Sequence, residues 1–122
     1  MARAGTGGNG GTGGAGAAGG GFAGSGGTGG IGLALSNGTI NNSGLITAGN
    51  GGSSGAGPVP GFAGPGGTGI VGSNLTIKNS GSITAGLSGD GTTRANAIIF
   101  TGGSNTLTLQ AGSTITRNKP PW

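Results

Sequence analysis

The chain has 122 residues, of which 37 are glycine and none is histidine, cysteine or tyrosine. Five basic residues and a single acidic one, Asp90, give a formal net charge of +4 at pH 7. This composition excludes an ordinary globular domain, disulfide bonds and thiolate metal sites, and it leaves no pair of side chains for acid–base catalysis.

Residues 1–30 form a glycine-rich, low-complexity segment in which Phe22 is the only Ile, Leu, Val or Phe. Glycine loses the most backbone freedom on folding and adds no side chain to a core, so we expect this segment to be disordered. The first five residues run into glycine without an apolar stretch, and we therefore expect no secretory signal here.

Three later segments repeat one pattern, at residues 38–47, 75–84 and 107–116. In the second copy, Leu75 and Ile77 alternate with polar residues, which is typical of a strand with one buried face. Asn79-Ser80-Gly81 predicts a turn, and a second short extended run follows it. Because no window has the apolar period of a helix, the pattern predicts an all-β chain.

A single strand–turn–strand unit cannot bury its own apolar side chains, so we expect the copies to stack. Asn42 and Asn79 would then pair their amides in a column that Ala111 interrupts. The predicted interior columns are Ile40, Ile77, Leu109 and Ile46, Ile83, Ile115. The predicted outward columns are Thr39, Thr76, Thr108 and Thr47, Thr84, Thr116.

The stacked repeats are expected to occupy residues 31–116, interrupted by a glycine-rich insertion at 51–68. Residues 117–122 form a non-repeat tail, because consecutive prolines cannot continue the interior of a sheet. Phe22 and Phe62 recur in matching glycine-rich flanks, 21–29 and 61–69, and we expect both to pack against the neighbouring repeat, with exposure for binding as the alternative.

Thr39–Gly44, Thr76–Thr84 and Asn105–Leu109 resemble rungs of the passenger domains of Gram-negative autotransporters. The resemblance covers about residues 31–50 and 69–116. It implies a short right-handed parallel β-helix, or solenoid, with glycine-rich disordered insertions. It also implies a non-catalytic passenger fragment with a structural or adhesive role in virulence, at the bacterial cell surface or outer membrane or secreted, with a ligand on a host or cell surface.

Two other interpretations remain open. Gly8–Gly16 is similar to the glycine-triplet repeats of mycobacterial PE/PGRS surface proteins. Alternatively, the whole chain is a flexible spacer without an autonomous fold. In each case the scattered basic residues do not form the stripe that nucleic acid requires, so no nucleic-acid partner is expected. Unpaired strand edges at the ends of a stack predict self-association.

Several short motifs match functional patterns without the residues that the chemistry needs. Gly51–Gly55 fits the nucleophile-elbow pattern, but no histidine is present to activate its serine. Gly89-Asp90-Gly91 has one carboxylate where calcium needs several. Glycosylation patterns at Asn37, Asn41 and Asn74 are expected by chance in a chain rich in Asn, Ser and Thr. We therefore predict no enzyme, no catalytic, cofactor-binding or metal-binding residue, and no small-molecule substrate.

Overall fold

The structure is a computed structural model that describes residues 11, 14, 16 and 22–117. This part of the chain is all-β and contains no helix. The N-terminal five residues, most of the segment similar to PE/PGRS repeats and nearly all of the tail lie outside the described residues. The strands are β1 (Leu33–Asn42), β2 (Leu45–Thr47), β3 (Ile70–Asn79), β4 (Ser82–Thr84), β5 (Ile98–Gly102), β6 (Thr106–Leu109) and β7 (Thr114–Thr116).

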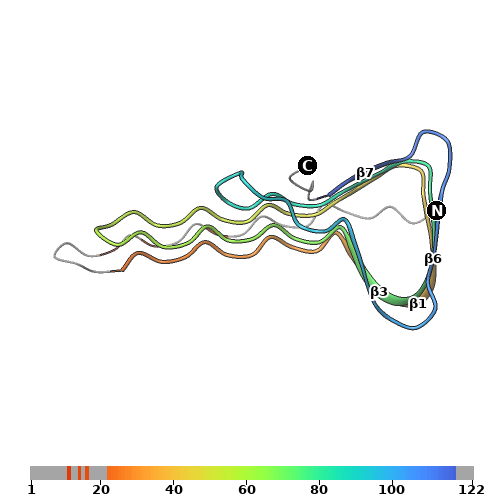
Figure 1. The fold of residues 1–122 in the computed structure, drawn as a ribbon, viewed down its shortest axis with the longest axis horizontal. Coiled ribbons are helices and arrows are strands. Elements are labelled where there is room, and N and C mark those ends of the chain that lie inside the picture. The colour runs from red at the N-terminus through yellow and green to blue at the C-terminus, as the bar shows by residue number, and fades with distance from the viewer. Residues whose placement is uncertain (1–10, 12–13, 15, 17–21, 118–122) are drawn as a thin grey trace, which may run out of the picture.

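The strands form two parallel sheets, one ordered β1-β3-β5, with β6 also pairing with β3, and one ordered β2-β4-β7. Residues 33–47, 70–84 and 98–116, here called the first, second and third repeats, therefore lie side by side (Figure 1). Between the first two repeats the partners are 37 residues apart along the whole length, from Leu33 with Ile70 to Thr47 with Thr84. The predicted strand–turn–strand repeat is confirmed.

The apolar core is a set of aliphatic side chains that the pairing aligns in columns. The predicted column Ile46, Ile83 and Ile115 is confirmed by the register of β2, β4 and β7. The largest fully buried aliphatic side chains, all less than 2% exposed, are Ile46, Ile70, Leu75, Ile77 and Ile83. The second repeat contributes four of these five, because it has a neighbour on both sides.

The other predicted column is wrong in its third member. Ile40 pairs with Ile77, but Ile77 pairs with Leu107, and Leu109 lies beside Asn79. The spacing between the second and third repeats is not constant, because the third repeat contains extra residues. The sequence separation between paired residues is 28 at Ile70, 30 at Ile77 and 32 at Ile83. The outward column likewise ends in Thr106 rather than Thr108.

The glycine-rich segments are not disordered where the structure describes them. They project from the sheets as a long arm, formed by residues 22–32, 48–69 and 85–97 and called the glycine arm below (Figure 1). The N–H groups of residues 23, 26, 29 and 32 donate to the carbonyl oxygens of residues 59, 62, 65 and 68. One bond in every three residues matches the three residues per turn of a polyproline II helix.

A second series of bonds has the same period and runs antiparallel. The N–H groups of residues 49, 52 and 55 donate to the carbonyl oxygens of residues 30, 27 and 24. The segments approach so closely that a Cβ at Gly64 would lie 2.1 Å from the carbonyl oxygen of Gly27. Only glycine fits such a position. The glycine content, which predicted disorder, is therefore what permits this close packing.

Candidate functional site

The outer surface of β1, β3 and β6 carries two columns of polar side chains. Successive side chains in a strand point to opposite faces, so the residues that flank the buried Ile40 and Ile77 point outward. Neighbouring strands lie about 4.8 Å apart, which sets the spacing within each column. We call this surface the polar face; its columns are Thr39, Thr76, Thr106 and Asn41, Lys78, Thr108.

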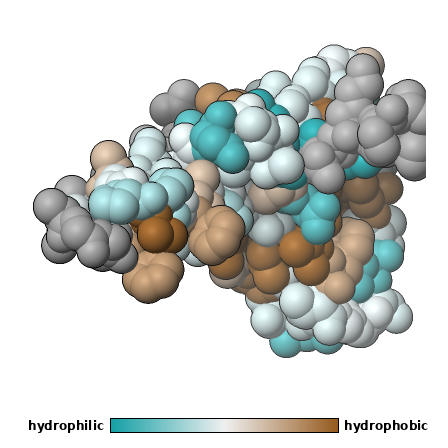
Figure 2. Space-filling model, turned by 60° about the vertical axis from the view of Figure 1, so that its left-hand side comes forward, coloured by the Kyte–Doolittle hydropathy of each residue, from teal (hydrophilic) through white to brown (hydrophobic). Residues whose placement is uncertain are grey.

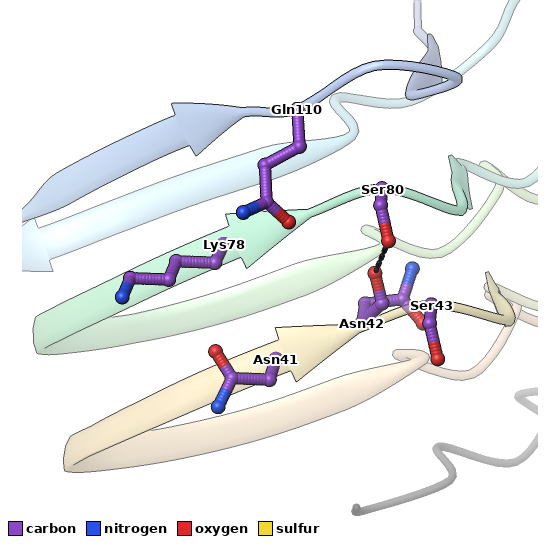
Figure 3. Close-up of a pocket in the computed structure, with 6 residues that line it drawn as sticks. All are labelled: Asn41, Asn42, Ser43, Lys78, Ser80 and Gln110. Carbon is purple, nitrogen blue, oxygen red and sulfur yellow. Dashed lines mark hydrogen bonds between the residues drawn. The ribbon is translucent and has the colours of Figure 1, made fainter.

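A hollow of about 360 Å³ opens beside the polar face, where the strands reach their turns. In Figure 3, Asn41, Lys78 and Gln110 come from three successive repeats and lie one above another. The lining contains an ammonium group, three amides and two hydroxyls, and no carboxylate. The lining residues are Asn41, Asn42, Ser43, Lys78, Ser80 and Gln110. These groups can bind hydroxyl-bearing or anionic ligands by hydrogen bonds, but they supply no acid–base pair.

Two buried asparagines hold the turns beneath this hollow. The Nδ2 of Asn42 donates to the Oδ1 of Asn79 at 2.8 Å, and the Nδ2 of Asn79 donates to the carbonyl oxygen of Gly81 at 3.0 Å. Asn42 is 6% exposed and Asn79 is 0% exposed. The predicted amide column is confirmed for this pair, although both residues end strands and the column continues to Leu109, not Ala111.

A second asparagine pair was not predicted. Asn37 and Asn74 lie within β1 and β3 with φ of 58° and 53°, a backbone region that asparagine tolerates better than most residues. The Nδ2 of Asn74 donates to the Oδ1 of Asn37 at 3.0 Å, and the N–H of Ser104 donates to the Oδ1 of Asn74 at 3.1 Å. The signal for this pair in the sequence is its 37-residue spacing, which equals the register of β1 and β3.

One side of the glycine arm carries exposed apolar side chains, of which only Phe22 and Phe62 were considered from the sequence, as an alternative. Side chains larger than alanine recur at every third position of residues 22–31 and 61–68, so they share one face of each segment. Phe22 and Phe62 are each 81% exposed, which shows that their predicted packing against a neighbouring repeat is wrong. This side of the arm carries Phe22, Ser25, Thr28, Ile31 and, from the adjacent segment, Val59, Phe62, Pro65 and Thr68. Figure 2 shows separate apolar patches among polar residues on one side of the molecule.

Phe22 and Phe62 are not paired with each other in the register of the arm. Phe22 bridges Val59, and the N–H of Phe62 donates to the Oγ of Ser25 at 3.2 Å. The matching flanks at 21–29 and 61–69 are 40 residues apart, whereas the arm keeps the 37-residue register of the strands. The difference of three residues is one period of the arm, so Gly24, Gly27 and Gly30 still lie beside glycines, which are Gly61, Gly64 and Gly67.

Two of the short sequence motifs, at Ser53 and Asp90, lie in the glycine arm. Ser53 is exposed on the arm. The Asp90 carboxylate accepts hydrogen bonds from the hydroxyls of Ser88 and Thr92 and from the N–H of Thr92, and these bonds lower its pKa from 3.8 to about 2. Asp90 thus closes a turn. Within the described residues, no group of three or more acidic, His or Cys residues could hold a metal ion.

Comparison of the chain with protein-family models, with curated proteins and with solved structures finds no match. The described part of the chain also offers no helix that could cross a lipid bilayer. The polar face, the hollow and the glycine arm are therefore the features that bear on function.

Proposed function

We propose that this chain is a non-catalytic segment of a right-handed parallel β-helix with a structural and adhesive role at the bacterial cell surface, as in the autotransporter passengers that its repeats resemble. The observation that supports the proposal most directly is the shared register of β1, β3 and β6. This register aligns Thr, Asn and Lys side chains on the outer surface, over the aliphatic columns of the core. Such a surface can bind a ligand through hydrogen bonds without a catalytic group.

The proposed mechanism is repeated hydrogen bonding to an extended ligand on a host or cell surface. The polar face repeats its groups at intervals of about 4.8 Å across the strands. A polysaccharide carries hydroxyl groups at regular intervals and can contact several strands at once, so weak single contacts add up. Lys78 allows acidic sugars as well as neutral ones, because its ammonium group donates to carboxylates.

The test is binding of the purified chain to an array of neutral and acidic oligosaccharides. The double variant Thr76→Ala/Lys78→Ala removes the middle of the polar face without touching the core, and we expect it to weaken binding at least tenfold. Ser53→Ala, which removes an exposed hydroxyl from the arm, is expected to bind as the wild-type chain does. Binding to no oligosaccharide, or equal binding by the double variant, would contradict the proposal.

The rival interpretation is a flexible spacer without an autonomous fold. The hydrogen bonds of the glycine arm argue against it, since they tie residues 22–32 and 48–69 to each other at every third residue. Digestion with a protease of broad specificity separates the two interpretations. A folded chain leaves a protected fragment that contains residues 69–116, whereas a spacer is cut throughout.

A further inference from the structure

One end of the stacked repeats leaves its interior side chains uncovered. In the first repeat Ile40 and Ile46 are only 6% and 1% exposed. In the third repeat Leu107, which continues the column of Ile40 and Ile77, is 39% exposed, and Leu109 is 56% exposed. Strand β6 pairs with β3 on one side, and in the described part of the chain no strand pairs with its other side.

Apart from its short length of four residues, strand β6 also lacks the features that usually protect an edge from pairing with another chain. Such features are charged side chains, proline and bulges. No residue from Ile98 to Thr116 is charged or is proline. A register shift does interrupt this sheet, but it lies in β5, opposite Gly72 and Ser73. The backbone donors and acceptors along the free side of β6 therefore fit one kind of partner, an extended strand.

The sequence of β6, Thr-Leu-Thr-Leu, is complementary to itself in an antiparallel pair. In a two-fold arrangement the strand meets its own copy running the other way, and every register that keeps the faces matched places leucine opposite leucine and threonine opposite threonine. A shift by one residue would place leucine on the polar side, so the pattern selects a small number of registers. A partner with a different pattern would not be matched on both faces.

We propose that two copies of this chain form a two-fold dimer by antiparallel pairing of their β6 strands. Leu107 and Leu109 of each copy cover those of the other, which reduces the exposed apolar surface of the third repeat. The dimer closes, because a two-fold pair occupies the free side of β6 in both copies. The two sheets then join edge to edge with both polar faces on the same side.

The test measures the mass of the full-length chain by sedimentation at concentrations from about 1 to 100 µM. Leu109→Lys places a charge at the proposed interface. Leu45→Lys is its matched control, since Leu45 lies in the first repeat and is 57% exposed, as against 56% for Leu109. We expect a dimer for the wild-type chain and for Leu45→Lys, and at least a tenfold larger dissociation constant for Leu109→Lys.

A second measurement does not depend on the lysine variant being folded. The chain has no cysteine, so Thr108→Cys introduces a single thiol at the centre of the proposed pair. Mild oxidation is expected to give a disulfide-linked dimer, whereas Ser53→Cys on the arm stays mostly unlinked. A wild-type chain that is monomeric throughout, particles that grow beyond the dimer with concentration, or equal cross-linking of the two cysteine variants would overturn the proposal.

Discussion

At the scale of single residues, the asparagine pair beneath the hollow is the clearest test of how the repeats are joined. Asn79 is fully buried and is bonded at both ends of its amide, to Asn42 and to the carbonyl oxygen of Gly81. Asn79→Ala leaves the buried Nδ2 of Asn42 and this carbonyl oxygen without those bonds. We expect the free energy of unfolding in urea to fall by about 1–3 kcal/mol.

The control for this substitution is Asn41→Ala. Asn41 is adjacent to Asn42 but exposed on the polar face, so its loss should change the free energy of unfolding by no more than about 0.5 kcal/mol. Equal losses for Asn79→Ala and Asn41→Ala would mean that the buried amide pair does not hold the first two repeats together.

The turns give a second comparison, between equivalent glycines of consecutive repeats. A Cβ at Gly44 would meet nothing within 4 Å, whereas a Cβ at Gly81 would lie 2.1 Å from the carbonyl oxygen of Gly44. We expect Gly81→Ala to lower the free energy of unfolding by about 1–3 kcal/mol, because backbone atoms cannot move aside cheaply. Gly44→Ala should leave the free energy of unfolding unchanged or raise it slightly. A decrease comparable to that of Gly81→Ala would contradict the stacking of the two turns.

At the scale of elements, the strands could be predicted from sequence and the glycine arm could not. Leu75, Ile77 and Ile83 show the alternation of a half-buried strand, and the structure buries all three. The arm escaped prediction because disorder was inferred from the lack of side chains to bury. Its order comes instead from backbone hydrogen bonds between segments far apart in sequence, at a period of three that helix and strand patterns do not test.

This period predicts that the arm tolerates insertions of three residues but not of one. A single glycine inserted between Gly64 and Pro65 would shift Phe62 into the place of Gly61, where a Cβ lies 2.3 Å from the carbonyl oxygen of Gly24. Inserting Thr-Gly-Gly at the same point keeps a glycine at every crowded position. We expect the one-residue insertion to lose protection of the arm amides from hydrogen exchange and the three-residue insertion to keep it.

Both insertions lengthen the same segment, so each serves as the control for the other. The added chain length by itself costs little, since even a doubling of a loop costs only about 0.6 kcal/mol. If the three-residue insertion lost as much amide protection as the single glycine, the arm would depend on its particular sequence and not on the spacing of its glycines.

At the scale of the whole molecule, stacking was predictable for the first two repeats and only partly for the third. A constant spacing holds between Ile40 and Ile77, but the register shift in β5 and the longer turns of the third repeat move Leu107 into the place predicted for Leu109. The extra residues of the third repeat are accommodated by the way its turns close in space. Aligning the sequences of the repeats does not contain this information. The polar face inherits the same change, since Thr106 replaces Thr108 in its first column.

Because each repeat contacts only its neighbours, the position of a substitution should decide how far its effect spreads. Ile77 lies between Ile40 and Leu107 and is 0% exposed. Ile77→Ala is therefore expected to cost about 2–5 kcal/mol and to lower amide protection in both β1 and β6. Leu107→Ala, at the end of the column and 39% exposed, should cost about 1–2 kcal/mol and leave β1 protected. Hydrogen exchange read by mass spectrometry distinguishes the two patterns, and unchanged protection of β1 in Ile77→Ala would show that the first repeat is held by something other than this column.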